Sequence, residues 1–255
     1  MPKLLAPIHA NAGVQAWYTR QLQTLVTAMA KEMLADIRQA WTDDAPDIGM
    51  AADSVWSLTQ AFQRWADRWT FRMTQAAQQL SVQFASRAFT ATQTSMQQAL
   101  RDAGFTVRFK PTRRSVKVYQ LVIDQQVGLI KSIPQQYLTD VRAVVYQSVM
   151  EGGNMQRVAA DVRQKYGVTH RRAALIARDQ NHKAKAIIER ERRRELGITR
   201  AKWRHSGAGK EPRPEHVKFS GEYYDIAKGA YLEGEWVWPG TAINCRCTDM
   251  AVIDD

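Results

Sequence analysis

Residues 55–84 read VWSLTQAFQRWADRWTFRMTQAAQQLSVQF. Apolar side chains recur through this stretch at intervals of three and four residues, which places them on one face of an α-helix. Neither proline nor glycine occurs between Ala51 and Ala103, and Gly104 can then end the helix. The sequence therefore predicts one helix of about 50 residues, which would be roughly 75 Å long.

A second, shorter stripe of apolar positions precedes this helix. It extends from Val14 to Trp41, and the run Asp43-Asp-Ala-Pro-Asp47 then breaks it, because proline lacks a backbone donor. Two consecutive helices of unequal length predict an antiparallel hairpin over residues 1–104, with the longer arm projecting. Three tryptophans share the apolar spacing of the longer helix, which favours core packing over a stacking platform for nucleic acid: Trp56, Trp65 and Trp69.

Residues 105–118 have a different pattern. Phe105, Val107 and Phe109 alternate with polar residues, and the segment 110–114 can form a loop. This alternation predicts two short strands, a small β-hairpin that links two helical parts of the chain.

Helical spacing resumes at Tyr119 and continues to about residue 200. The run Glu151-Gly-Gly-Asn154 is expected to end one helix. Gly167 is expected to end the helix that begins at Met155, and Thr169 can then cap a further helix that Gly197 stops.

Residues 201–255 are rich in glycine and short apolar runs, which predicts a small module of short strands and turns. The predicted fold class is mainly α with a small C-terminal α+β module. It consists of a long N-terminal helical hairpin, central helices and a glycine-rich C-terminal domain. The expected segments are the hairpin (1–104), the β-hairpin linker (105–118), a basic helical region (119–200) and the C-terminal module (201–255).

The composition argues against several classes of protein. A chain of 255 residues is long enough to bury a real core. Its N-terminus lacks the apolar run of a signal peptide, and no segment approaches the ~20 consecutive apolar residues of a membrane-spanning helix. Two cysteines are too few for a disulfide framework and are typical of synthesis in a reducing cytoplasm. We therefore expect no membrane partner.

The positive charge is concentrated in the middle of the chain. The net charge is +11, and residues 105–204 alone hold 22 Lys and Arg against 8 Asp and Glu, a net +14. Such a block predicts an acidic partner, either nucleic acid or an acidic protein surface, whereas a solvated helix face with Glu–Arg pairs is the alternative. Candidate contacts to DNA phosphates, without base specificity, are Arg108, Lys110, Arg113, Arg114, Lys117, Arg171, Arg172, Arg178, Lys183, Lys185, Arg190, Arg192, Arg193 and Arg194.

The C-terminal residues carry a resemblance to a known family. Trp238-Pro-Gly-Thr-Ala-Ile-Asn-Cys-Arg-Cys247 follows the clusters Trp203-Arg-His205 and Pro212-Arg-Pro-Glu-His216. These ordered elements resemble the C-terminal domain of phage Mu F-like head morphogenesis proteins, and the resemblance covers roughly residues 119–253. The matching positions are Trp203, His205, Arg213, His216, Gly221, Pro239, Gly240, Asn244, Cys245, Arg246 and Cys247.

The resemblance implies a minor structural protein of a tailed bacteriophage head. Such a protein would be made in the host cytoplasm and incorporated in several copies inside the head near the portal. Its implied partners are the portal protein, other capsid proteins and packaged double-stranded DNA. Two alternatives stay open: a DNA-binding protein ejected into the host with the genome, and an enzyme that uses the Cys/His cluster.

The Cys-x-Cys pair raises the question of metal. Zinc takes four nitrogen or sulfur ligands, and the candidate set is His216, Cys245 and Cys247, with His205 and His182 as further options. Alternate residues of a strand point to opposite faces, which argues against chelation by both thiols unless a bulge or turn intervenes. Small buried residues or a reducible pair are the alternatives, so we expect no cofactor and keep zinc as an open option.

The sequence lacks the usual signatures of catalysis. A zinc deaminase needs His-x-Glu and Pro-Cys-x-x-Cys, but the chain has His216-Val-Lys218 and Asn244-Cys-Arg-Cys247. The segment Gly207-Ala-Gly-Lys-Glu211 lacks the spacing of a phosphate-binding loop. We predict no enzyme and no catalytic residue. Residues 203–253 should form one compact module in which His216, Asn244, Cys245 and Cys247 lie close together.

Overall fold

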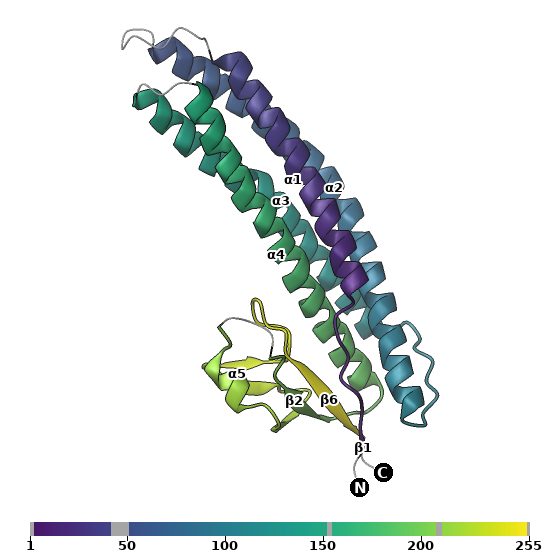
Figure 1. Ribbon diagram of the computed structural model, residues 1–255. Coiled ribbons are helices and arrows are strands. Elements are labelled where there is room, and N and C mark those ends of the chain that lie inside the picture. Colours follow the sequence, from purple (N-terminus) through teal and green to yellow (C-terminus); the bar gives the residue numbers. More distant parts are fainter. Residues whose placement is uncertain (1–2, 42–50, 152–154, 208–210, 254–255) are drawn as a thin grey trace. The chain divides into compact units, whose positions relative to one another are not determined.

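The computed structural model describes residues 3–41, 51–151, 155–207 and 211–253, and the side chains of these residues apart from 51–55 (Figure 1). The chain forms two compact units, which are described separately. The helical unit comprises Tyr18–Ser81 and Gln125–Ile176, and the mixed unit comprises Met1–Trp17, Val82–Asp124 and Ala177–Asp255.

Four long helices make up most of the chain, and each contributes residues to both units. They are α1 (Ala12–Ala40), α2 (Ala51–Asp102), α3 (Arg113–Met150) and α4 (Met155–Glu195). The predicted 50-residue helix is confirmed, because α2 contains 52 residues without a break. Among the described residues, no helix is both long and apolar enough to cross a bilayer. The predicted breaks at 43–47 and 152–154 lie outside the described residues.

The helical unit is a bundle of four helical segments that lie side by side (Figure 1). The Tyr18 hydroxyl of α1 donates to Gln126 of α3 at 3.0 Å, and the Trp65 indole of α2 donates to the Met29 carbonyl of α1 at 3.2 Å. The apolar stripes of the sequence face this interior. Its fully buried side chains include Tyr18, Leu22, Met29, Met33, Ile37, Leu58, Phe62, Trp65, Met73 and Tyr137.

The predicted β-hairpin over residues 105–118 is wrong. Residues 105–112 form no strand, and α3 begins at Arg113. Thr112 and Ser115 cap this helix reciprocally, since the Thr112 N–H donates to Ser115 Oγ at 2.8 Å and the Ser115 N–H donates to Thr112 Oγ1 at 3.1 Å. The alternating apolar residues instead serve packing, because Val107 and Phe109 lie against the core of the mixed unit.

The predicted helix boundary at Gly167 is also wrong. Helix α4 continues through it from Met155 to Glu195, although glycine costs about 1 kcal/mol relative to alanine inside a helix. Thr169 does not cap a new helix, because its hydroxyl donates to the Lys165 carbonyl one turn earlier, at 3.1 Å. Gly167 and Thr169 therefore do not end the helix here, because the helix packs in the bundle on both sides of them.

The mixed unit contains a four-stranded sheet of order β1-β6-β2-β3, with all neighbours antiparallel. Its strands are β1 (Lys3–Leu4), β2 (Arg200–Arg204), β3 (Tyr223–Asp225) and β6 (Thr248–Ile253). The short helix α5 (Pro214–Lys218) and the hairpin of β4 (Ala230–Leu232) and β5 (Glu235–Val237) complete this unit. The predicted fold class, mainly α with a small C-terminal α+β module, is confirmed.

The core of the mixed unit draws on distant parts of the chain. Leu5, which follows β1, and Leu100, near the end of α2, pack with Trp203, Tyr224 and Ala251 of the sheet. The end of α2 therefore does not project as a free arm, which corrects the predicted hairpin geometry. This wider core explains how a module of such short strands holds together, since a domain of about 55 residues alone buries little apolar surface.

Candidate functional site

His216 occupies the middle of α5 and is only 2% exposed. Its ring meets the Trp203 ring edge-on, with 5.2 Å between centroids and an interplanar angle of 84°. Trp203 belongs to β2 and is itself buried in the core, so the sheet fixes the position of the imidazole from one side.

Both cysteines face this imidazole. Cys245 Sγ lies 3.6 Å from His216 Nδ1, and Cys247 Sγ lies 3.8 Å from the same atom. The expectation that alternate residues point to opposite faces does not apply, because the two cysteines precede β6 in an irregular segment. Asn244 has a φ of 59°, and the Cys245 N–H donates to the Ala242 carbonyl at 3.0 Å, so a turn aims both sulfurs to one side.

The three side chains are among those that line a polar pocket of about 260 Å³. Two hydrogen bonds connect Asn244 to α4: its side-chain oxygen accepts from Arg178 at 3.2 Å, and its N–H donates to Asp179 at 2.7 Å. Arg213, just before α5, donates to the Ile243 carbonyl at 3.0 Å. The lining residues are Arg178, His205, Ser206, Glu211, Pro212, Arg213, His216, Asn244, Cys245, Arg246 and Cys247.

The two thiols change each other's pKa in opposite directions. A hydrogen bond from Cys247, aided by the backbone N–H groups of Cys247 and Gly240, lowers the pKa of Cys245 to about 5 against its burial. The same hydrogen bond, together with burial, raises the pKa of Cys247 above its usual range. The hydrogen bond between the two side chains therefore makes Cys245 the more acidic thiol of the pair.

Other residues of the family resemblance shape the surrounding backbone. Gly221 has a φ of 98°, and its N–H donates to the Trp203 carbonyl at 2.8 Å, which holds the turn after α5 against β2. Gly240, in the turn with Pro239, has a φ of 84°, and a Cβ there would meet the His182 carbonyl at 3.4 Å. His205 lines the pocket, and its Nδ1 accepts from the Gly207 N–H at 3.1 Å.

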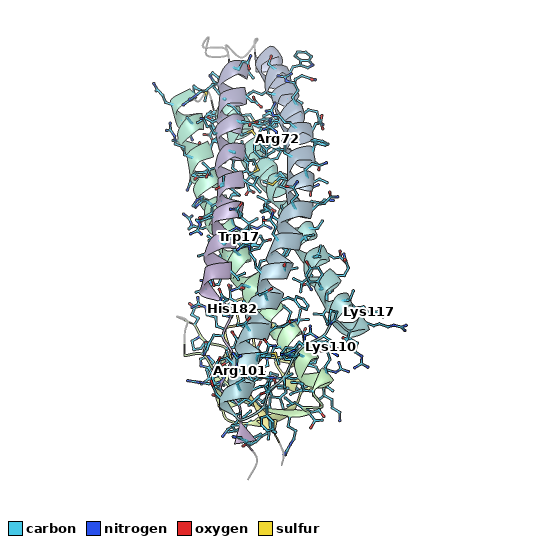
Figure 2. All side chains as sticks on the ribbon, turned by 90° about the vertical axis from the view of Figure 1, so that its right-hand side faces the viewer. Trp17, Arg72, Arg101, Lys110, Lys117 and His182 are labelled. Atoms are coloured by element: carbon cyan, nitrogen blue, oxygen red, sulfur yellow. The ribbon has the colours of Figure 1, made fainter. Side chains whose placement is uncertain are left out.

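His182 is not among the residues that line the pocket of the cysteines. Its position on α4 is labelled in Figure 2. Burial, followed by the nearby charges of Lys185 and Arg246, lowers the pKa of His182 to about 4, so its ring is neutral at pH 7.

A buried network of charges links α4 to the sheet. Arg193 donates to Asp249 of β6 at 2.7 Å and also pairs with Glu189, which accepts from Lys185 at 2.5 Å. The Tyr224 hydroxyl donates to Asp249. Although burial alone would raise the pKa of Asp249, the positive charges of Arg193 and Lys185 hold it below its usual value. Burial and the nearby Asp249 raise the pKa of Tyr224.

Buried ion pairs correct part of the predicted DNA-contact set. Lys185, Arg192 and Arg193 are buried, and all three are engaged in ion pairs within the chain, so they cannot reach a DNA backbone. The sequence signalled the pairing of Glu189 with Arg193 through their spacing, but it gave no sign of Asp249, which lies 56 residues away.

The remaining candidates differ in accessibility. Lys183 is partly buried and pairs with Asp179 at 2.9 Å, and Arg190 stacks over the Trp238 ring at 4.1 Å. Arg172 and Arg178 are also partly buried. The exposed candidates are Arg108, Lys110, Arg113, Arg114, Lys117, Arg171 and Arg194.

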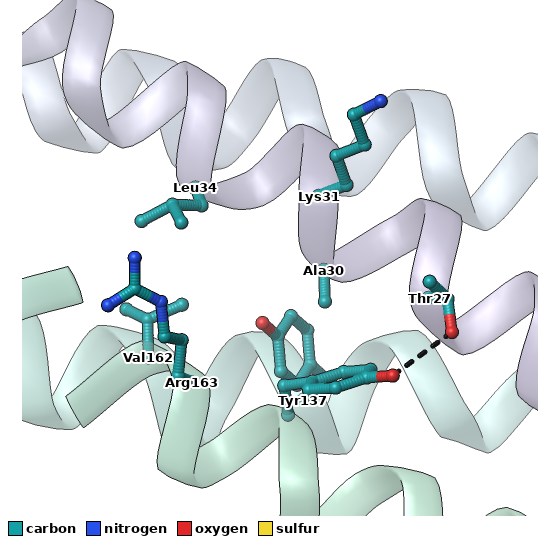
Figure 3. A pocket seen from close by; sticks show the side chains of 8 residues that line it. Thr27, Ala30, Lys31, Leu34, Tyr137, Val162 and Arg163 are labelled. Carbon is teal, nitrogen blue, oxygen red and sulfur yellow. Dashed lines mark hydrogen bonds between the residues drawn. The ribbon is translucent and has the colours of Figure 1, made fainter. Parts of the chain in front are cut away.

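A second cavity lies in the helical unit (Figure 3). It has a volume of about 220 Å³, and the Thr27 and Tyr166 hydroxyls meet at 3.1 Å on its wall. The buried Tyr137 hydroxyl, which lines it, has no hydrogen-bond partner among the described residues. Burial raises the pKa of this tyrosine. The sequence gave no signal for this cavity, because its lining comes from helical positions that resemble ordinary core.

Comparisons with known proteins agree with the C-terminal motifs. The family described as "Phage Mu protein F like protein" matches residues 139–250, from the last third of α3 into β6. An uncharacterized protein of Haemophilus influenzae is 27% identical over 258 residues, which covers 98% of this chain and 55% of that protein. The chain thus spans about half the length of this relative. No solved structure matches the chain. The resemblance inferred from the motifs is confirmed, because residues 139–250 of this chain match the phage Mu F-like family.

Proposed function

We propose that this chain is a minor structural protein of a tailed phage head, associated with the portal or the capsid interior. The observation that carries the proposal is the family match over residues 139–250, because this family suggests a phage head morphogenesis protein and a virion component. A structural head-protein family also suggests that the chain is not an enzyme. The matched residues include His216, Cys245 and Cys247, which line the polar pocket. The family match therefore covers the C-terminal module that carries the motifs.

The helical unit is the proposed docking element. Trp56 and Phe71 on α2 are each 66% exposed, so a protein that covered them would bury apolar surface. We place them in the contact with the portal or another capsid protein. The helices beneath them bury a row of apolar side chains, so the core of the bundle holds α2 in place.

The experiment that tests this assignment is co-purification with the portal protein encoded by the same genome, followed by cryo-EM of assembled heads. We expect the chain to be retained by the portal and to appear inside the head near the portal vertex. Heads that contain the portal and major capsid protein but lack this chain would overturn the assignment. Density for the chain on the outer capsid surface would contradict the interior placement.

The proposed DNA contact is the basic segment, which we define as Arg108, Lys110, Arg113, Arg114 and Lys117. All five side chains are exposed, and Figure 2 shows Lys117 extending away from the ribbon. No Asp or Glu occurs in sequence between Asp102 and Asp124 to balance them. The first turn of α3 also lacks an acidic residue, although the positive end of a helix dipole favours one there. This concentration of positive charge suits phosphate groups.

We predict salt-dependent binding of double-stranded DNA through the basic segment. Each phosphate contact contributes about 0.9 to the slope of log affinity against log salt concentration. Replacing all five residues with glutamine should therefore reduce that slope by about 4.5 if each contacts one phosphate. Fluorescence anisotropy with duplexes of unrelated sequence, measured over a salt series, gives the slope.

The matched control replaces five exposed basic residues elsewhere with glutamine: Arg20, Lys31, Arg38, Arg64 and Arg204. It removes the same net charge and should change the slope far less than the basic-segment variant does. Equal slopes for the two variants would mean that the segment is not the contact. Absence of binding by the unaltered chain even at low salt would refute DNA contact altogether.

A further inference from the structure

The spacing of three buried ligand atoms is that of a metal site. The nitrogen of His216 and the sulfurs of Cys245 and Cys247 all lie within 4.8 Å of one another. A tetrahedral zinc ion with Zn–S bonds of about 2.3 Å and Zn–N bonds of about 2.05 Å separates nitrogen and sulfur ligands by roughly 3.5 Å. The observed nitrogen–sulfur distances are 3.6 Å and 3.8 Å, which a side-chain adjustment of a few tenths of an ångström would bring to that value.

The chemistry of the ligands selects the metal. Two thiolates and one imidazole are soft and borderline ligands that favour zinc over the hard cations calcium and magnesium. His216 Nδ1 faces both sulfurs, so the same nitrogen that now contacts the thiols is the one available to a metal. The three side chains are 2%, 6% and 4% exposed, which shields such a site from bulk water.

The backbone holds these ligands in place before any metal arrives. His216 is fixed by α5 and by its edge-on contact with Trp203. The turn at Asn244 is fixed by hydrogen bonds to Arg178 and Asp179 of α4. A site assembled from two separately anchored segments suffers little loss of conformational freedom on binding.

We propose that His216, Cys245 and Cys247 bind one zinc ion, whose fourth coordination position opens into the polar pocket. Within the part of the chain that the structure describes, the cluster contains three metal-binding residues. His205 and Glu211 line the pocket but lie outside this cluster, so water fills the fourth position. The ion ties α5 to the segment that precedes β6, which goes beyond the proposed role in the phage head.

Metal analysis of the full-length chain tests the proposal directly. The chain is expressed with added zinc, purified without chelator under reducing conditions, and measured by inductively coupled plasma mass spectrometry. We expect about one zinc ion per chain. After removal of zinc, titration with Co²⁺ should give a thiolate-to-cobalt charge-transfer band and the intense visible bands of tetrahedral cobalt. This spectrum requires no variant and therefore does not depend on a variant's folding.

Variants identify the ligands. Cys245→Ser, Cys247→Ser and His216→Ala should each lower zinc content to less than about one tenth of the unaltered value at equal free zinc. The matched controls are His205→Ala, within the pocket, and His182→Ala, outside it, and both should retain full zinc content. Circular dichroism of each variant separates loss of a ligand from loss of the fold.

Thermal unfolding gives an independent readout. A chelator should lower the Tm of the unaltered chain but leave the Tm of folded Cys245→Ser unchanged, because a ligand that binds only the native state stabilises it. Two results would overturn the proposal. One is an unaltered chain, verified as reduced by thiol titration, that neither retains zinc nor gives the cobalt spectrum. The other is full zinc content in the His216→Ala variant. Neither result bears on retention by the portal, so the head assignment is tested separately.

Discussion

Replacing Asp249 with alanine is expected to lower the free energy of unfolding by about 3–5 kcal/mol. Asp249 is buried, accepts a hydrogen bond from Arg193 at 2.7 Å and accepts another from Tyr224. Its removal leaves the Arg193 guanidinium buried with one carboxylate partner fewer, and an uncompensated buried charge is costly. Chemical denaturation followed by tryptophan fluorescence measures the loss, because the buried Trp203 lies in the same unit.

An ion pair in the helical unit provides the control. Asp36 accepts from Arg68 at 2.5 Å, but both side chains are partly exposed, so solvent screens their attraction. Asp36→Ala should therefore cost no more than about 1 kcal/mol. The double variant Arg193→Met with Asp249→Leu should lose less unfolding free energy than Asp249→Ala does. It removes both buried charges, and Lys185 still pairs with Glu189. Similar losses of unfolding free energy for Asp36→Ala and Asp249→Ala would show that burial does not determine how much an ion pair contributes to stability.

The same residue predicts the acid limit of stability. The pKa of Asp249 is lowered in the folded chain from its ordinary value of 3.8. A carboxyl group with a lowered pKa contributes stability above its unfolded-state pKa, and that contribution is lost as pH falls towards its folded-state pKa. The unfolding free energy should therefore decline below about pH 4, and more steeply for the unaltered chain than for folded Asp249→Asn.

The sequence predicts the helices well because their information is local. The spacing of apolar residues between positions 55 and 84 is enough to place one face of α2 in a core. The start of α3 was also readable, since Thr112 and Ser115 form a capping pair, but the alternation of Phe105, Val107 and Phe109 favoured strands. Alternation can reflect packing of an irregular segment against a core, and the sequence alone does not separate the two.

Contacts between distant residues account for what could not be predicted. Strand β1 pairs with β6, so Lys3 meets Ile253 from the other end of the chain. The proximity of His216 to the cysteines followed from the expectation that the module closes on itself. The direction of the two sulfurs, however, depends on the left-handed backbone at Asn244, which no spacing rule specifies.

The second large effect is expected at Trp65, in the first third of α2. Its side chain is fully buried, its indole N–H donates to the Met29 carbonyl at 3.2 Å, and its ring lies 5.9 Å from that of Tyr137. Trp65→Ala removes these contacts and opens a cavity that rigid neighbouring helices cannot fill. We expect a loss of about 3–5 kcal/mol in unfolding free energy.

Trp56 provides the matched control, because it is the same residue type on the same helix but is 66% exposed. Trp56→Ala should change the unfolding free energy by no more than about 0.5 kcal/mol. Trp65→Phe should fall between the two, since it keeps a buried ring but loses the hydrogen bond to Met29. Denaturation followed by circular dichroism measures all three variants with one signal. If Trp65→Ala lowers the unfolding free energy as little as Trp56→Ala does, the apolar stripe of residues 55–84 does not form the bundle core. The long helix must then be stabilised by a partner instead.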